Sequence, residues 1–139
     1  MDCRVWGTVD DRLIELVAEP ADAFRVVGLP EDRTRTTADR VRAAVVNSGL
    51  VREAPPVSIR LVPPVRSGAT WNLDLAVALA SLAWTGLAGQ GVRWILASGR
   101  LGLDGAVLAR GLGERVTLAD VARRSCHTPI VGFERMWEL

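Results

Sequence analysis

The side chains that could carry chemistry in this 139-residue chain are limited from the start, because the sequence contains no lysine. All 17 residues of the lysine-plus-arginine count are arginine, and His127 is the sole histidine. A Ser–Lys hydrolase dyad, a Schiff base with a substrate carbonyl and the lysine of a Walker phosphate-binding loop all require a side-chain amine. The sequence therefore excludes these three kinds of chemistry for the residues that it contains.

Arginine is concentrated in one predicted helix, over residues 32–48. The group consists of Arg33, Arg35, Arg40 and Arg42. Clustered arginines can bind phosphate groups, so a nucleic-acid-binding module is one candidate function. However, Glu31, Asp32 and Asp39 lie among them and lower the positive potential. A solvated helix face is the simpler interpretation, and a net charge of +1 gives no general basic excess.

The sequence gives little support for a metal site, a disulfide bond or a membrane-spanning segment. The nearest approach to a set of metal ligands is Asp10, Asp11, Glu15 and Glu19. Carboxylates in turns and at alternating positions usually solubilise a surface, so we expect no metal site and no cofactor. Cys3 and Cys126 are interpreted as free thiols. No signal peptide and no apolar run long enough for a bilayer is present, which predicts a cytoplasmic protein without membrane contact.

The predicted elements alternate between strands and helices in a single domain, residues 1–139. Strand patterns lie near residues 3–9, 12–18, 24–28, 57–62 and 93–97, and Asp10-Asp11 joins the first two in a hairpin. Helical patterns lie near residues 32–48 and 72–85, and the second is apolar nearly all round, so it should be the more buried. We also expect a small hairpin at 100–109 and a short helix at 117–124. Together these predict an α+β domain with a mostly antiparallel sheet.

Several specific motifs lie between residues 4 and 110. Residues 28–49 contain GLPE, DRVRAAV and NSG, and IRLVP, NLDLAVAL and GRLGLDG follow farther along the chain. These motifs and their spacing resemble the N-terminal domain of the competence-associated, magnesium-chelatase-like AAA+ ATPases. The resemblance implies a fold similar to the Lon protease domain, a two-layer sandwich with a ribosomal-protein-like βαβ arrangement. The residues after Gly111 diverge from the family, so we expect a remodelled C-terminal third.

The same resemblance locates the positions where a Lon-type hydrolase would carry its catalytic groups. In Lon the nucleophilic serine precedes the long apolar helix, which places Thr70 near the serine and Glu114 near the lysine. A hydroxyl needs an adjacent base to become a nucleophile, and neither Thr70 nor Ser67 has a lysine available in this sequence. We therefore expect no catalysis, with Thr70 in a loop that caps a helix. The absence of a glycine-rich loop ending in Lys-Ser or Lys-Thr also excludes the ATPase motor.

Large apolar side chains suggest a surface for a partner. Trp84 and Trp94 lie in apolar elements and are expected in the core, whereas Trp71 replaces a small residue of the family's loop. Phe133, Met136 and Trp137 share one face of the C-terminal segment at helical spacing. Buried aromatic anchors are common in protein interfaces, so these residues and Trp71 are the candidate partner-binding set. The alternative is that Trp137 folds back onto the sheet of its own molecule.

The preferred interpretation is a stand-alone, non-catalytic interaction or regulatory module with a degenerate Lon-like fold. Its expected partner is a separately encoded AAA+ ATPase or a second copy of the chain. A nucleic-acid-binding module that uses the four arginines is the second candidate, and a degenerate hydrolase is the third.

Overall fold

The computed structural model describes residues 4–10, 12–68, 70–85, 94–96, 100–101, 103, 106–108 and 115–117. The main sheet contains β1 (Arg4–Val9), β2 (Arg12–Pro20), β3 (Arg25–Val27), β4 (Val57–Val62) and β5 (Trp94–Leu96). A smaller sheet contains β6 (Arg100–Leu101), β7 (Ala106–Leu108) and β8 (Arg115–Thr117). The helices are α1 (Glu31–Asn47), the 3-10 helix η1 (Thr70–Leu73) and α2 (Asp74–Trp84).

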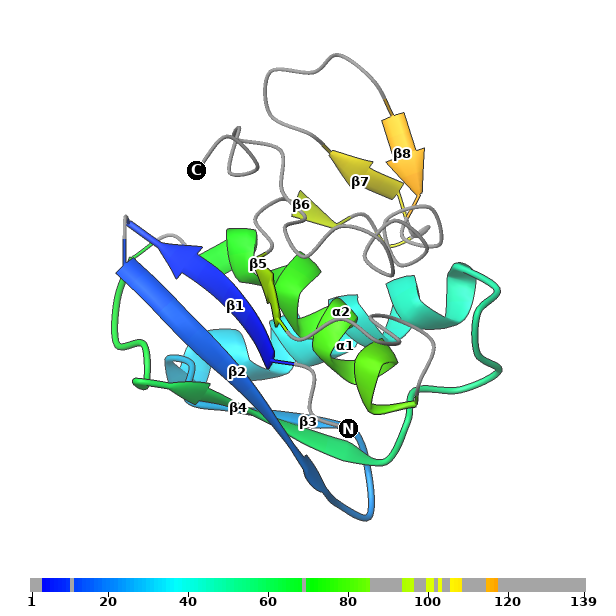
Figure 1. The fold of residues 1–139 in the computed structure, drawn as a ribbon, viewed down its shortest axis with the longest axis horizontal. Helices are drawn as coiled ribbons and strands as arrows, with labels where there is room; N and C mark the ends of the chain where they lie inside the picture. Colours follow the sequence, from blue (N-terminus) through cyan, green and yellow to red (C-terminus); the bar gives the residue numbers. More distant parts are fainter. Residues whose placement is uncertain are drawn as a thin grey trace.

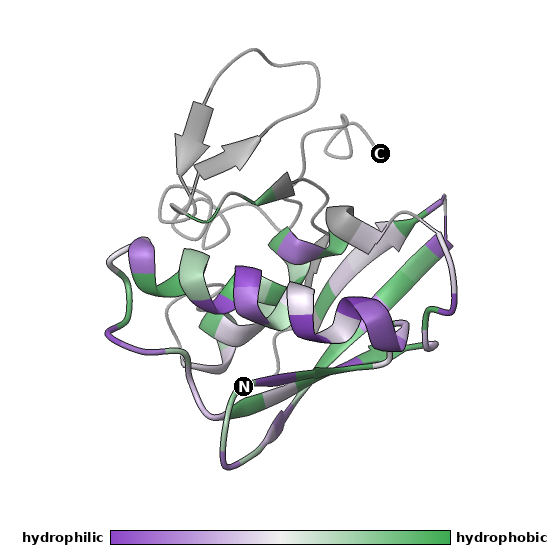
Figure 2. Cartoon of the chain, turned by 180° about the vertical axis from the view of Figure 1, so that it is seen from behind, coloured by the Kyte–Doolittle hydropathy of each residue, from purple (hydrophilic) through white to green (hydrophobic). Residues whose placement is uncertain are grey.

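Both long helices lie on the same side of the main sheet, which makes a two-layer α+β arrangement (Figure 1). The view from behind shows α1 in front of the strands, with hydrophilic residues along much of its length (Figure 2). The predicted α+β class is thus confirmed. Neither helix of the described ranges is long and apolar enough to span a bilayer.

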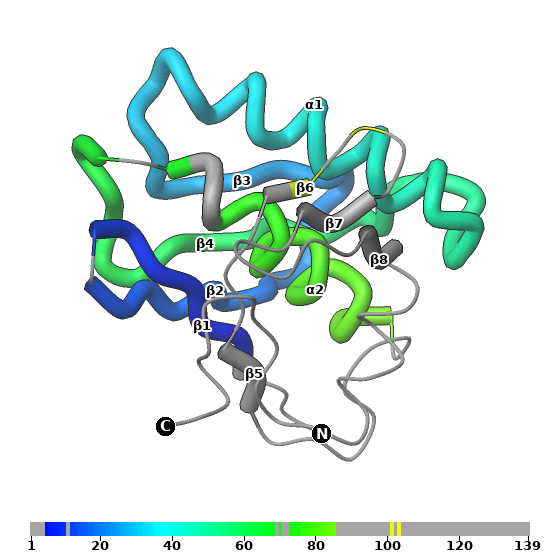
Figure 3. Tube along the Cα trace, turned by 90° about the horizontal axis from the view of Figure 1, so that it is seen from above, coloured from blue at the N-terminus to red at the C-terminus, as the bar shows by residue number. Residues whose placement is uncertain are grey.

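The main sheet has the strand order β3-β4-β2-β1-β5 and is mixed. The pairs β1–β2 and β2–β4 are antiparallel, whereas β3–β4 and β1–β5 are parallel. Antiparallel pairs make up most of the register, as predicted, but the two shorter parallel pairs were not predicted. Parallel neighbours require a crossover connection, and α1 supplies it between β3 and β4 as a βαβ unit. Seen from above, α1 runs alongside β3, and β4, β2 and β1 follow in that order (Figure 3).

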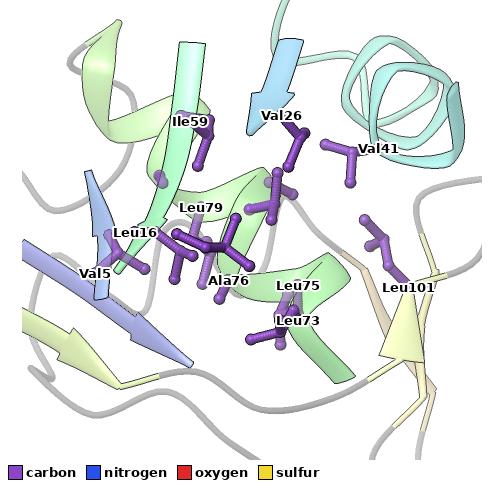
Figure 4. Packing of buried hydrophobic residues seen from close by; sticks show 14 of the residues in the cluster. Val5, Leu16, Val26, Val41, Ile59, Leu73, Leu75, Ala76, Leu79 and Leu101 are labelled. Carbon is purple, nitrogen blue, oxygen red and sulfur yellow. The ribbon is translucent and has the colours of Figure 1, made fainter. Parts of the chain in front are cut away.

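The hydrophobic core lies between the sheet and the helices. Strand register places Val5 opposite Leu16 and Gly7 opposite Ile14, so alternate residues of the hairpin face the helices. Figure 4 shows side chains of the sheet, such as Leu16 and Ile59, gathered against Leu79 of α2. Residues 74–82 of α2 are all buried, whereas only Thr37, Val41, Ala44 and Val45 are buried in α1. The prediction that the second helix is the more buried is confirmed.

Local turn signals in the sequence predicted several connections correctly. Asp10 has a φ of 46° in the turn of the β1–β2 hairpin. Helix α1 ends at Asn47-Ser48-Gly49, where Gly49 has a φ of 81° and donates its amide to Val46. Strands β6 and β7 pair in an antiparallel manner across the Asp-Gly segment, as predicted. These features depend on neighbouring residues, which is why the sequence alone was sufficient.

Two predictions about particular residues were wrong. Trp84, expected in the core, is 44% exposed because it is the last residue of α2 and follows the buried run 74–82. Thr117, expected to begin a helix, is the last residue of β8, which pairs with β7. The remainder of that predicted helix, residues 118–124, lies outside the described ranges, as does the side chain of Trp94.

Candidate functional site

A polar hollow of about 240 Å³ lies between the first half of α1 and the beginning of the η1–α2 segment. We call it the α1–α2 pocket. Its lining residues are Asp32, Arg33, Thr36, Thr37 and Arg40 from α1, with Thr70 and Asp74 from the facing segment. The pocket therefore includes Thr70, the position that the sequence placed near the nucleophile of a Lon-type hydrolase.

The α1 side of the pocket follows from helical spacing. Arg33, Thr36, Thr37 and Arg40 are separated by three or four residues, so they share one side of the helix. Thr37 is only 6% exposed and borders the core residues Val41 and Ala44. The pocket thus lies at the boundary between the buried stripe of α1 and solvent, which allows charged groups to reach it without crossing the core.

Arg33 joins α1 to the loop that precedes α2. Its Nη1 donates to the Oγ1 of Thr70 at 2.9 Å and to the carbonyl oxygen of Gly68 at 3.4 Å. Thr70 is 2% exposed, so this hydroxyl is held against a cation in a nearly buried position. A guanidinium stays protonated in proteins and cannot accept a proton. Arg33, which donates this hydrogen bond to Thr70, is therefore not a base.

The loop before α2 is also held from the side of the β1–β2 hairpin. Arg12 donates through Nη2 to the carbonyl oxygen of Ser67 at 3.3 Å. Gly68 has a φ of +111°, and a Cβ atom there would overlap the carboxylate of Asp10 and approach Val9. The positive φ and the buried Val9 side chain both favour glycine at this point. The loop is consequently positioned by contacts on two sides, with Thr70 directly after it.

The other charged pair of the pocket is formed by Asp74 and Arg40. The Oδ2 of Asp74 lies 3.5 Å from the Nε of Arg40, and the side chains are 5% and 43% exposed, respectively. Asp74 is in the first turn of α2, where the positive end of the helix dipole stabilises a carboxylate. Asp74 is thus a buried carboxylate with two sources of positive potential, which ties the start of α2 to the middle of α1.

The four arginines of α1 fall into two pairs on different flanks of the helix. Arg33 and Arg40 line the pocket, whereas Arg35 and Arg42 are exposed and lie about 200° farther round the helix. Arg42 pairs with Asp39 at 3.0 Å, and its guanidinium lies 5.9 Å from the centre of the Phe24 ring. The predicted nucleic-acid-binding set therefore does not share one surface of α1.

The other predicted site residues belong to the C-terminal part of the chain, to η1 and to the β1–β2 hairpin. Phe133, Met136, Trp137 and Glu114 lie outside the described ranges. The backbone of Trp71 belongs to η1, and its side chain is outside the described part. No group of three potential metal ligands occurs among the described residues. Within the acidic set, Glu19 pairs with Arg60 at 2.9 Å.

Sequence reasoning did not identify Thr36, Thr37 and Asp74 as members of one site. The signals were present but weak. The two threonines lie three and four residues after Arg33, and Asp74 is the only charged residue in the apolar stretch 73–82. Nothing in the spacing along the chain indicated that the start of α2 would face this side of α1.

Comparison with known proteins identifies a family that this chain matches. Residues 15–131 match the family model described as subunit ChlI of Mg-chelatase. The chain is 34% identical over 116 residues to the uncharacterized protein YifB of Salmonella typhimurium, and 33% identical over 117 residues to YifB of Escherichia coli. These alignments cover 82% and 83% of this chain but only 22% of each relative. The chain thus spans about a fifth of the length of the relatives that it matches.

Proposed function

The chain belongs to the family of the ChlI subunit of Mg-chelatase, and we propose that its described domain is a non-catalytic interaction module that works within or beside a AAA+ ATPase. The family takes its name from a subunit, which is a component of a larger assembly. The relatives are several times longer than the matched region, in keeping with a domain that serves a larger protein.

The observation that carries the non-catalytic part of the proposal is the hydrogen bond from Arg33 to Thr70. A threonine nucleophile needs a neighbouring base that removes its proton. Arg33 cannot take this proton, and the nearby carboxylate of Asp74 lies against Arg40. The threonine hydroxyl therefore acts as a structural acceptor between α1 and the η1–α2 segment.

The finer resemblance to the Lon protease domain is also part of the proposal. It is supported by the order of loop, η1 and buried helix α2, because the loop before a long apolar helix holds the nucleophile in the fold that the motifs resemble. Here this loop is held by Arg12 and Arg33 through its own carbonyl oxygens. The loop before α2 is thus fixed by hydrogen bonds, and so is the Thr70 hydroxyl that follows it. A fixed loop of this kind is consistent with a domain that presents a rigid surface to a partner.

The experiment combines a hydrolysis assay with a binding assay on the full chain. Fluorogenic peptides and casein should remain uncleaved by the wild type, by Thr70→Ala and by Thr70→Ser. Association with the family's AAA+ ATPase module, measured by sedimentation, should be the same for wild type and Thr70→Ser. Hydrolysis that Thr70→Ser retains and Thr70→Ala abolishes would falsify the non-catalytic assignment.

Nucleic-acid binding is the second candidate function, and the alignment of Arg33 with Arg40 on one flank of α1 favours it. Each phosphate contact lowers the logarithm of the association constant by about 0.9 per tenfold increase in salt for duplex DNA. Since the arginines are divided between two flanks, one flank offers two guanidinium groups. A fluorescence titration of duplex DNA should therefore have a salt slope of magnitude about 2 or less. A much steeper slope would show that α1 is not the only DNA-contacting element.

A further inference from the structure

We propose that the α1–α2 pocket binds a carboxylate group of a partner protein, the end of an aspartate or glutamate side chain or a C-terminus, and that Arg33 holds it. The proposal rests on the interaction function proposed above and names the chemistry that the pocket recognises. Arg33 is the starting point, because its surroundings differ from those of every other described arginine.

Only Arg33 and Arg40 among the described arginine side chains are partly buried, whereas the others are exposed. Arg40 has the carboxylate of Asp74 beside it. In the described part of the chain no carboxylate oxygen lies within 4.0 Å of the Arg33 guanidinium, and its hydrogen bonds go to the neutral acceptors Thr70 Oγ1 and Gly68 O. A partly buried cation is most stable when an anion offsets its loss of hydration. The part of Arg33 that lines the pocket is thus suited to bind an anion.

The polar groups around Arg33 suit an oxyanion. Thr36, Thr37 and Thr70 line the same hollow, and each hydroxyl has an O–H that can donate. The guanidinium itself has several N–H groups in a planar fork that matches the two oxygens of a carboxylate, and only Nη1 is used in the hydrogen bonds to Gly68 and Thr70. The site can therefore offer both charge and directed hydrogen bonds to one small anionic group.

Charge and size favour a carboxylate over a phosphate. Arg33 and Arg40 contribute two positive charges, and Asp32 and Asp74 contribute two negative charges, so the lining is formally neutral. A phosphate group carries a charge of roughly −1.5 to −2 and would be repelled more strongly by the two carboxylates. The hollow of about 240 Å³ is also smaller than the roughly 300–1,000 Å³ of small-molecule sites. It has room for a side-chain terminus rather than a nucleotide.

The test uses sodium acetate as the probe and the full chain as the protein. At constant ionic strength set with sodium chloride, acetate is titrated while the Arg33 Nε–H and Thr70 amide resonances are followed by NMR. We expect saturable shifts for the wild type and at least tenfold weaker acetate binding for Arg33→Gln. Glutamine removes the charge and keeps a polar N–H donor, and urea denaturation of the same variant checks that the domain remains folded. Arg35→Gln removes the same charge from an exposed position and should change the affinity less than twofold.

The outcomes separate this proposal from the function on which it rests. Equal losses in Arg33→Gln and Arg35→Gln, or a linear response to acetate in the wild type, would overturn the pocket assignment. Inorganic phosphate should bind more weakly than acetate, and tighter phosphate binding would refute the carboxylate assignment. If acetate does not bind but the chain still associates with the ATPase module, the carboxylate site is refuted and the proposed interaction function is retained. Peptide hydrolysis that depends on Thr70 removes the non-catalytic function whatever the acetate result.

Discussion

The Nη1 of Arg33 and the Oγ1 of Thr70 lie 2.9 Å apart and connect two segments that are 37 residues apart in the chain. The contact joins the first turn of α1 to the first residue of η1, at the point where the buried helix α2 is about to begin. The Thr70 hydroxyl accepts this hydrogen bond, at the position where the proposed Lon resemblance would place a nucleophile. The stability of the α1–α2 pocket should depend on this pair.

Replacement of Arg33 by alanine should lower the free energy of unfolding by about 1–3 kcal/mol, because a hydrogen bond from a charged donor is lost and Thr70 stays nearly buried. Arg33→Gln should cost no more than Arg33→Ala, since glutamine keeps part of the side-chain stem. Urea denaturation monitored by circular dichroism measures both. Arg35→Ala is the control and should stay within about 0.5 kcal/mol of wild type. Equal losses for Arg33→Ala and Arg35→Ala would show that the Thr70 contact contributes no stability.

Removal of the Asp74 carboxylate should be more costly than removal of an exposed one. Asp74→Ala leaves Arg40 partly buried without its partner, and breaking a buried pair costs about 3–5 kcal/mol. Because Arg40 is 43% exposed, solvent reduces the loss, and we expect about 2 kcal/mol. Asp39→Ala breaks an exposed pair with Arg42 and should cost less than about 0.5 kcal/mol. A double-mutant cycle with Arg40→Ala would reveal no coupling energy if the 3.5 Å contact were unimportant.

A side chain at position 68 should disturb the loop that positions Thr70. Gly68→Ala combines a φ of +111° with a close approach to the buried Val9 side chain, so we expect a loss of about 2–4 kcal/mol. Gly49→Ala is the matched control, since Gly49 has a φ of +81° and nothing within 4 Å of the added Cβ. It should lose only the backbone term of about 1–2 kcal/mol. Thermal unfolding compares them, and a milder effect at Gly68 than at Gly49 would contradict the packing of this loop.

The partner surface predicted from the C-terminal segment is tested by Trp137→Ala. If Trp137 anchors an interface, the substitution should weaken self-association or ATPase binding by about 2 kcal/mol and leave the melting temperature nearly unchanged. Sedimentation and differential scanning calorimetry give the two quantities. Glu138→Ala, at the adjacent residue, is a control for local disturbance. A sharp drop in melting temperature of a protein that stays monomeric would instead assign Trp137 to the core.

The sequence alone determines the local elements of this protein, whereas the tertiary structure determines which distant residues meet. Strands, the two long helices and the ends of α1 follow from local alternation, helical periodicity and turn residues, so β1, β2, β4 and α2 were predictable within a few residues. The absence of lysine is a property of the sequence alone. Short motifs in the sequence also indicated the magnesium-chelatase-like family, and the family match confirmed it.

Only the tertiary structure decided which distant residues meet. The parallel pairing of β3 with β4 depends on how α1 crosses the sheet, and turn patterns do not carry that information. Arg33 and Arg35 are two positions apart in the sequence, yet helix geometry turns the first toward Thr70 and the second toward solvent. Asp74 meets Arg40 because α1 and α2 pack side by side on one face of the sheet. Periodicity determines which face of a helix is buried, whereas the packing of helices and loops on the sheet determines which polar groups meet at the edge of that face.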